Sequence, residues 1–354
     1  MVARRAWEGA RVILAILIAM GIGCWTADGE AGDDVSVLLQ KMQQGKTATS
    51  YVGEMLIVHF SGKSRIRRYA VMRQGPNVER KEVVAEDGGK LEVTISDGKH
   101  TWSYRPARRM VIKRPALGPE DARLLMRKTF ELIEQNYAIQ IEQEEVNIGG
   151  RKAAVVELVP KDISTRPSRR IWVDRENGVA LRTEVIGPDR STMLLSYFSK
   201  IRFAPRLSAE NFVLRVPRDT AVRPVIEEAH YNIESVRSSV DFPVLTPQYL
   251  PRGFTLLRIL IRSYPRAKEI QIQYSDGLSM LSLFQDRRRK STASAPAGSS
   301  IARARRPIEV GEAEGSLYNL GLLRLVNWRQ NDNALALVGE LEEAEMLKVA
   351  KSVE

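Results

Sequence analysis

The chain has 354 residues, a formal net charge of +11, 44% hydrophobic residues and 27% charged residues. This composition is ordinary for a globular protein, and it excludes both an intrinsically disordered chain and a protein with many membrane spans. Because domains commonly contain ~100–200 residues, the chain has room for two domains.

The first 31 residues have the pattern of an export signal. Three arginines precede an apolar run over residues 12–25, and a polar segment with small residues follows it. A basic start, a short apolar run and small residues are typical of a secretory signal peptide. The run is shorter than the ~20 residues that a spanning helix needs. We therefore expect residues 1–31 to be a signal peptide and the protein to be exported.

The single cysteine, Cys24, lies at the end of that apolar run. Its position is similar to that of the cysteine in the lipobox of bacterial lipoproteins, which is lipidated and becomes the new N-terminus. Gly21 stands where such motifs usually have leucine. The alternative is a plain signal peptide cleaved near Ala27 or Ala31, which would leave a mature protein without a thiol. The sequence favours this second reading, and lipidation of Cys24 stays open.

Strand-like segments and turns follow each other over residues 51–115. Asp-Gly pairs separate alternating segments at two of the turns, and such pairs are strong hairpin signals. The pattern predicts an antiparallel meander in which Trp102 and Tyr104 face the sheet interior. The cations that follow are expected at the rim, where they would meet lipid head groups or an acidic partner segment: Arg108, Arg109, Lys113 and Arg114.

An amphipathic helix interrupts the meander over residues 118–136. It starts with Gly-Pro and acidic residues, and it places Leu125 and Phe130 on one apolar stripe. Strands resume with residues 137–146 and continue to residue 203.

Residues 51–60 carry apolar side chains on both faces of the predicted strand, whereas a sheet with one solvated face shows polar residues on that side. Two interpretations stay open. The helix over 118–136 packs on one face and closes an ordinary core, or it is the lid of an apolar groove that admits acyl chains. The candidate residues of such a lipid cavity are Met55, Leu56, Ile57, Val58, Trp102, Tyr104, Leu125 and Phe130.

Residues 217–240 show little periodicity and suit a linker, after which a second unit begins. It opens with three prolines that forbid a central strand, contains a hairpin that turns at Asp276-Gly277, and ends in a helix.

The positive charge is concentrated in residues 287–306, which hold seven cations and no acid in a Ser/Ala/Pro/Gly-rich context. Such a segment cannot bury enough apolar surface to order itself. It is either a solvated insertion or a contact to the phosphates of a membrane surface. Candidate partner contacts are Arg287, Arg288 and Arg289. Nucleic acid is the weakest alternative, because export removes that partner.

Nothing in the sequence supports catalysis, a metal site or a cofactor site. Gly62-Lys63-Ser64 lacks the first glycine of a P-loop. The histidines His59, His100 and His230 have no metal-ligand spacing. We expect a protein that is not an enzyme.

Several motifs carry a family resemblance when they are taken in order. ISDGKHTWSYRP, RIWVDRENGVALR and YFSKIRF resemble the LolA-like lipoprotein-carrier fold. DFPVLTPQYLPRGF, QYSDGLSMLSLFQ and ALALVGEL look like the C-terminal domain of the MucB/RseB family. The resemblance implies an α+β chain. Residues 34–216 would form an unclosed antiparallel β-barrel around a helical lid, and residues 241–354 a smaller α+β domain.

The family implies a function as well. It implies a periplasmic regulator that binds an anti-sigma factor, senses lipid or lipoprotein in a hydrophobic barrel and controls an envelope-stress sigma factor. The basic insertion at 287–306, which interrupts a hairpin of the C-terminal unit, and a lipidated Cys24 would both depart from the family pattern. The alternative is a periplasmic carrier of lipoproteins or lipids, of the LolA type.

Overall fold

The structure is a computed structural model that describes residues 42, 49–60, 64–75, 77–162, 166–264, 267–287 and 305–354. The predicted signal peptide, Cys24, Arg288 and Arg289 lie outside these residues. Within the part of the chain that is described, no helix is long and apolar enough to span a membrane.

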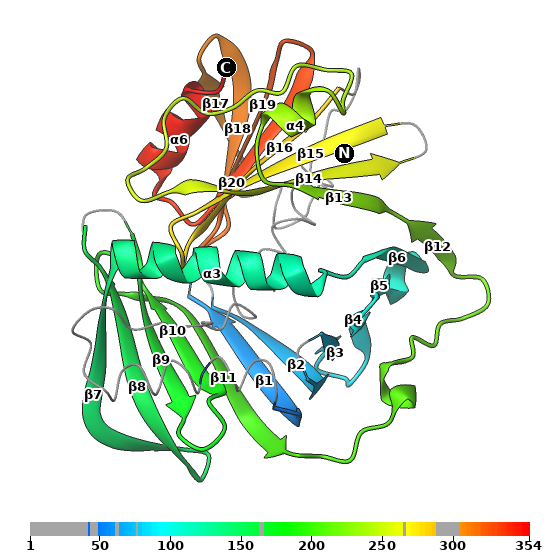
Figure 1. The fold of residues 1–354 in the computed structure, drawn as a ribbon, viewed down its shortest axis with the longest axis vertical. Helices are drawn as coiled ribbons and strands as arrows, with labels where there is room; N and C mark the ends of the chain where they lie inside the picture. Colours follow the sequence, from blue (N-terminus) through cyan, green and yellow to red (C-terminus); the bar gives the residue numbers. More distant parts are fainter. Residues whose placement is uncertain are drawn as a thin grey trace.

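The N-terminal half is a twelve-stranded sheet in the order β12-β6-β5-β4-β3-β2-β1-β11-β10-β9-β8-β7. Its end strands, β12 and β7, are not neighbours in this order, so the barrel stays unclosed (Figure 1). Its first strands are β1 (Tyr51–His59), β2 (Arg65–Gln74), β3 (Val78–Val84), β4 (Lys90–Asp97), β5 (His100–Arg105) and β6 (Met110–Pro115). The remaining elements are α3 (Pro119–Asn136), β7 (Tyr137–Ile148), β8 (Arg151–Pro160), β9 (Ser168–Asp174), β10 (Ala180–Ile186), β11 (Thr192–Phe203) and β12 (Ala221–Pro224).

The C-terminal half is an eight-stranded antiparallel sheet in the order β13-β14-β15-β16-β20-β19-β18-β17. Helix α6 covers one face, where Met346 and Val349 join an apolar cluster with Ile259 and Leu337. The elements are β13 (Ile226–His230), α4 (Glu234–Arg237), β14 (Thr255–Tyr264), β15 (Ala267–Ser275), β16 (Met280–Asp286), β17 (Arg305–Val310), β18 (Ala313–Asn319), β19 (Arg324–Gln330), β20 (Asn333–Gly339) and α6 (Glu343–Lys351). The predicted α+β class, with a large and a small unit, is confirmed.

Residues 217–240 contribute a strand to each sheet, although their sequence suggests a linker. Strand β12 runs parallel to β6, and β13 pairs with β14. Between them, the N–H of Val225 donates a hydrogen bond to the carbonyl oxygen of Lys113 at 2.8 Å. The connection therefore ties the two sheets together along β6.

Helix α3 lies between the two halves (Figure 1). Phe130 and Ile133 pack against Val156 and Ile171 of the N-terminal sheet. A second cluster contains Ile57 of β1 and Leu125 of α3 together with Met280 and Phe284 of the C-terminal sheet. The two sheets thus contribute to one continuous apolar core.

Candidate functional site

The face of β1 that carries Met55 and Ile57 is the inner face of the N-terminal sheet. Both side chains are buried, at 5% and 0% exposure, and they belong to the same apolar cluster as Leu125 of α3. The sequence left open which face looks inward, and this packing assigns it.

The predicted cavity residues divide over several places. Leu56 and Val58 are half-buried on the opposite, outer face of β1. Trp102 and Tyr104 pack with Phe212 in a separate cluster under the segment 207–216. Phe130 belongs to the core between α3 and strands β7–β9. Met55, Ile57 and Leu125 are the candidates that share a cluster spanning β1 and α3.

The sequence reasoning missed a polar wall that continues the inner face across β2 and β3. In the strand register, Ile57 lies opposite Arg67, Met55 opposite Tyr69, and Arg73 opposite Glu79. Residues opposite each other in a ladder share one face of the sheet. We call this set the inner wall: Met55, Ile57 and His59 of β1, Arg67, Tyr69 and Arg73 of β2, and Glu79 and Lys81 of β3.

Charge on the inner wall is predominantly positive. The Nζ of Lys81 lies 3.3 Å from the Oε1 of Glu79, and its side chain keeps 16% exposure. Burial alone would lower the pKa of Lys81, but Glu79 and Tyr51 outweigh it and the pKa is raised. Lys81 therefore stays protonated, on the same face of the sheet as Arg67 and Arg73.

The pKa of His59, the histidine of the inner wall, is also shifted by its surroundings. Burial, with Arg67 and Arg65 next, lowers the pKa of His59 to about 4 from an ordinary value of 6.5. His59 is therefore neutral in the folded protein at pH 7, in a cationic environment.

This shift predicts a pH dependence of stability. Because the pKa of His59 is lower in the folded than in the unfolded state, its contribution is complete above pH 6.5 and is lost as the pH falls towards 4. The free energy of unfolding of His59→Gln should fall less steeply over that window than that of the wild type, as measured by urea titration at several pH values. His100→Gln is the control. Equal slopes for wild type and His59→Gln would contradict the assignment.

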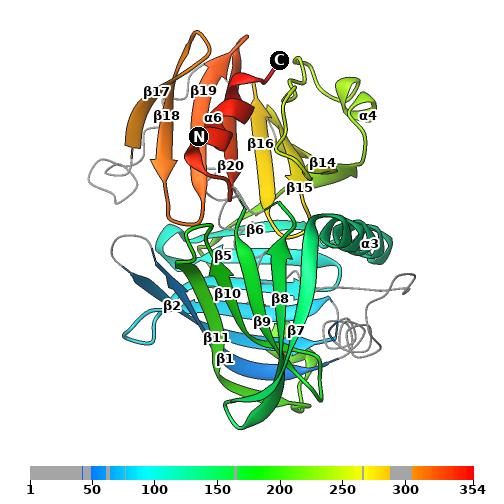
Figure 2. The same cartoon turned by 90° about the vertical axis from the view of Figure 1, so that its left-hand side faces the viewer.

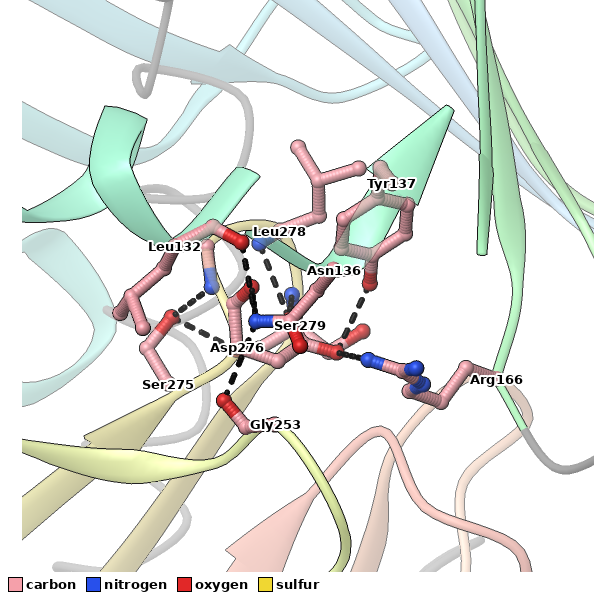
Figure 3. A network of polar contacts seen from close by, with 10 residues as sticks. Leu132, Asn136, Tyr137, Arg166, Gly253, Ser275, Asp276, Leu278 and Ser279 are labelled. Atoms are coloured by element: carbon pink, nitrogen blue, oxygen red, sulfur yellow. Dashed lines mark hydrogen bonds and ion pairs between the residues drawn. The ribbon is translucent and has the colours of Figure 1, made fainter. Parts of the chain in front are cut away.

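A polar network fixes the C-terminal end of α3 to the C-terminal sheet (Figure 3). The side-chain amide of Asn136 donates to the carbonyl oxygens of Gly253 and Asp276 at 3.2 and 3.0 Å. The hydroxyl of Tyr137 donates to Oδ2 of Asp276 at 2.7 Å, and Nη1 of Arg166 lies 3.4 Å from the same oxygen. We call this network the α3 clamp.

Close packing and a buried ion pair extend the clamp. Gly277 has a φ of +106°, and a Cβ there would lie 2.7 Å from the backbone nitrogen of Ile133 in α3. Nη2 of Arg169 contacts Oε2 of Glu340 at 2.5 Å, with 7% and 0% of the two side chains exposed. The Arg169–Glu340 pair joins β9 to the residue after β20, and the close contact at Gly277 packs the β15–β16 turn on α3.

The predicted rim cations do not form one surface. Arg108 and Arg109 are exposed, and Arg109 forms an ion pair with Asp219. Lys113 lies over the ring of Trp102, 4.6 Å from its centroid. Arg114 lies near Glu227 and Arg262 of the C-terminal half, where burial lowers its pKa. Separately, Arg287 donates to the carbonyl oxygen of Asp241 at 2.9 Å.

The described residues contain no group of three or more His, Cys, Asp or Glu side chains placed to hold a metal ion. What the geometry offers is an interior with an apolar side, a cationic side and a helix between two sheets.

Comparisons with known proteins agree with this architecture. The family model for the MucB/RseB N-terminal domain matches residues 34–216. No curated protein sequence matches the chain. A crystal structure of MucB in complex with MucA(peri) is similar at a TM-score of 0.56 and 16% identity, and covers 90% of this chain and 98% of that one. The complex structure of Pseudomonas aeruginosa MucA/MucB is similar at a TM-score of 0.57 and 16% sequence identity, over 91% of this chain and 98% of that one.

A crystal structure of MucB gives a TM-score of 0.54 at 15% identity, over 92% of this chain and 99% of that one. At these identities the structural likeness shows the fold, and the family model, which matches more than half of the chain, shows the family. The chain belongs to the MucB/RseB family, a family of periplasmic, non-enzymatic regulators.

Proposed function

We propose that this protein binds the periplasmic part of an anti-sigma factor and thereby controls an envelope-stress sigma factor. The observation that carries the proposal is the match over most of the chain to two structures of MucB in complex with MucA, one of them with MucA(peri). The match covers 90% and 91% of this chain, which is more than either half alone contains. This coverage supports a partner site that the whole two-sheet architecture carries.

The partner is tested directly with the purified chain and the periplasmic domain of the anti-sigma factor from the same organism. We expect the two to co-elute in size-exclusion chromatography. Failure to co-elute, together with transfer of a lipoprotein from one membrane fraction to another, would favour the carrier function instead. That alternative rests on the lipoprotein-carrier resemblance of the N-terminal half.

The second part of the proposal is that the N-terminal barrel senses an amphiphile. The inner wall supports it, because Ile57 lies opposite the cationic Arg67 and the same face carries Arg73 and Lys81 further along β2 and β3. An acyl chain would be buried against the apolar side chains, and an anionic head group would form charge-assisted hydrogen bonds with the cations. Leu125 of α3 packs in the same apolar cluster as Ile57. We therefore expect α3 to move when an acyl chain binds beside Ile57.

The inner wall offers a matched pair of variants for this proposal. Arg67 and Arg68 are neighbours on β2 whose side chains lie on opposite faces, opposite Ile57 and Leu56. We expect Arg67→Met to weaken binding of a fluorescent fatty acid by about tenfold, the loss of one charge-assisted contact. Arg68→Met should leave the affinity unchanged. Binding that is weakened equally by both variants, or by neither, would contradict a site on the inner wall.

A further inference from the structure

The first turns of α3, residues 119–128, pack on the N-terminal sheet through apolar side chains. Leu125 is buried in the cluster that contains Ile57 of β1. Met126 packs against the neighbouring cluster, which contains Val156 of β8. Figure 2 shows α3 at the boundary between this sheet and strands β14 and β15 of the C-terminal half. The first turns are therefore in a position to bond to either half.

The hydrogen bonds of the first turns go to the C-terminal half. Within the described part of the chain, their side chains form two hydrogen bonds beyond the helix. The hydroxyl of Tyr231 donates to Oδ1 of Asp121, and Nζ of Lys128 donates to the carbonyl oxygen of Leu256. Burial and the bond to Asp121 raise the pKa of Tyr231 to about 12, which keeps the donor protonated. Arg258 of β14 lies close enough to Asp121 for their charges to attract. We call these five residues the α3 latch.

The two ends of α3 are held differently. At its C-terminal end the helix passes directly into β7, and the α3 clamp holds it there together with Nζ of Lys161, which donates to the carbonyl oxygen of Glu134 at 2.8 Å. At its N-terminal end, the N–H of Ala116 donates to the β4–β5 turn, and Leu117 and Gly118 then lead into the helix. Loss of the latch would therefore free the first turns while the other end stays in place.

We propose that the C-terminal half controls the opening of the first turns of α3 through the α3 latch. Helical segments of this length are marginal in water when nothing packs on them. Without the latch the first turns would fray, and Leu125 would leave the cluster around Ile57. A partner that displaces the turn carrying Tyr231 would thus open the N-terminal sheet from the other half. The consequence for amphiphile binding rests on the proposed function, whereas the latch itself does not.

Hydrogen–deuterium exchange of the full chain tests the latch from both sides. Tyr231→Phe keeps the ring that packs on the apolar cluster and removes the hydroxyl. Lys128→Met keeps a long, helix-forming side chain and removes the ammonium group. Each variant should speed exchange in the first turns by about tenfold, the loss of one hydrogen bond to a charged or buried partner. Exchange in β8 should not change.

Two matched variants remove the same kinds of bond elsewhere. Tyr249→Phe removes a hydroxyl that donates to Oε2 of Glu345 at 2.7 Å, within the C-terminal half. Lys161→Met removes the ammonium group that bonds to Glu134 at the opposite end of α3. Neither change should affect exchange in the first turns. Wild-type exchange rates in both latch variants, or an equal increase in all four variants, would overturn the proposal.

Binding of a fluorescent fatty acid separates the latch from the amphiphile site. If the open form takes up the acyl chain, Tyr231→Phe and Lys128→Met should tighten binding by about tenfold, because more of the protein is then competent to bind. Faster exchange with unchanged affinity would contradict a gate at the first turns. Faster exchange without any binding, in wild type and variants alike, would contradict the amphiphile site and still support the latch.

Discussion

Replacing Gly277 with alanine is expected to destabilise the protein by roughly 4 kcal/mol. The backbone at Gly277 has a φ of +106°, which costs an L-residue about 1–2 kcal/mol. The new methyl group would also overlap the backbone nitrogen of Ile133, and overpacking of this kind costs about 1–3 kcal/mol. Because the overlapping atom belongs to the helix backbone, relief requires that α3 shift as a whole.

The chain supplies a control that separates these two effects. Gly311 also has a positive φ, of +61°, but a Cβ there would have no neighbour within 4 Å. Gly311→Ala should therefore cost only the backbone part, about 1–2 kcal/mol. Urea unfolding followed by circular dichroism gives both values. If Gly277→Ala cost no more than Gly311→Ala, α3 would not be pressed on the β15–β16 turn.

Arg169→Met should be of similar severity for a different reason. It leaves the carboxylate of Glu340 buried without its cation, and removal of one partner of a buried pair typically costs about 3–5 kcal/mol. Burial already raises the pKa of Glu340 in spite of Arg169. Because the pKa of Glu340 is higher in the folded than in the unfolded state, its contribution to stability is complete below pH 4.5 and is lost as the pH rises. Removal of Arg169 raises this pKa further. The loss in the free energy of unfolding caused by Arg169→Met should therefore be larger at pH 7 than at pH 5.

An exposed ion pair is the control for this variant. The side chains of Arg215 and Glu210 form an ion pair and are 79% and 72% exposed. Arg215→Met should therefore change the free energy of unfolding by less than about 1 kcal/mol. Adding Glu340→Gln to Arg169→Met should recover part of the loss, because a neutral amide costs less to bury than a carboxylate. Equal losses in Arg169→Met and Arg215→Met would contradict a stabilising role for the buried pair.

Local patterns predicted the elements well. The period of two in residues 65–74, bounded by turns, matches β2 (Arg65–Gln74), and the apolar stripe over 118–136 matches α3 (Pro119–Asn136). The Asp276-Gly277 turn was also predicted, since its signal lies within a few residues. The clamp that this turn forms with Asn136 and Tyr137 was not, because those contacts join residues far apart in the sequence.

The assignment of strand faces shows where sequence reasoning stops. Trp102 and Tyr104 alternate correctly, yet which side is interior depends on the segment 207–216, which brings Phe212 over them. The inner wall had a local signal that was overlooked, because Arg67, Tyr69 and Arg73 recur every second residue or a multiple of it in β2. Whether residues at such spacing face a core or solvent is decided by distant elements.

The apolar cluster that joins Ile57 and Leu125 to Met280 and Phe284 bears on how such proteins can be recombined. The match to the N-terminal domain model ends at residue 216, but a chain cut there would lose half of this cluster and every acceptor that Asn136 finds beyond α3. In a chimera of one half with the other half of a distant relative, the side chains from the two sheets that meet in this cluster would no longer be complementary. The smallest exchangeable module of this fold is then the pair of sheets together with the helix between them.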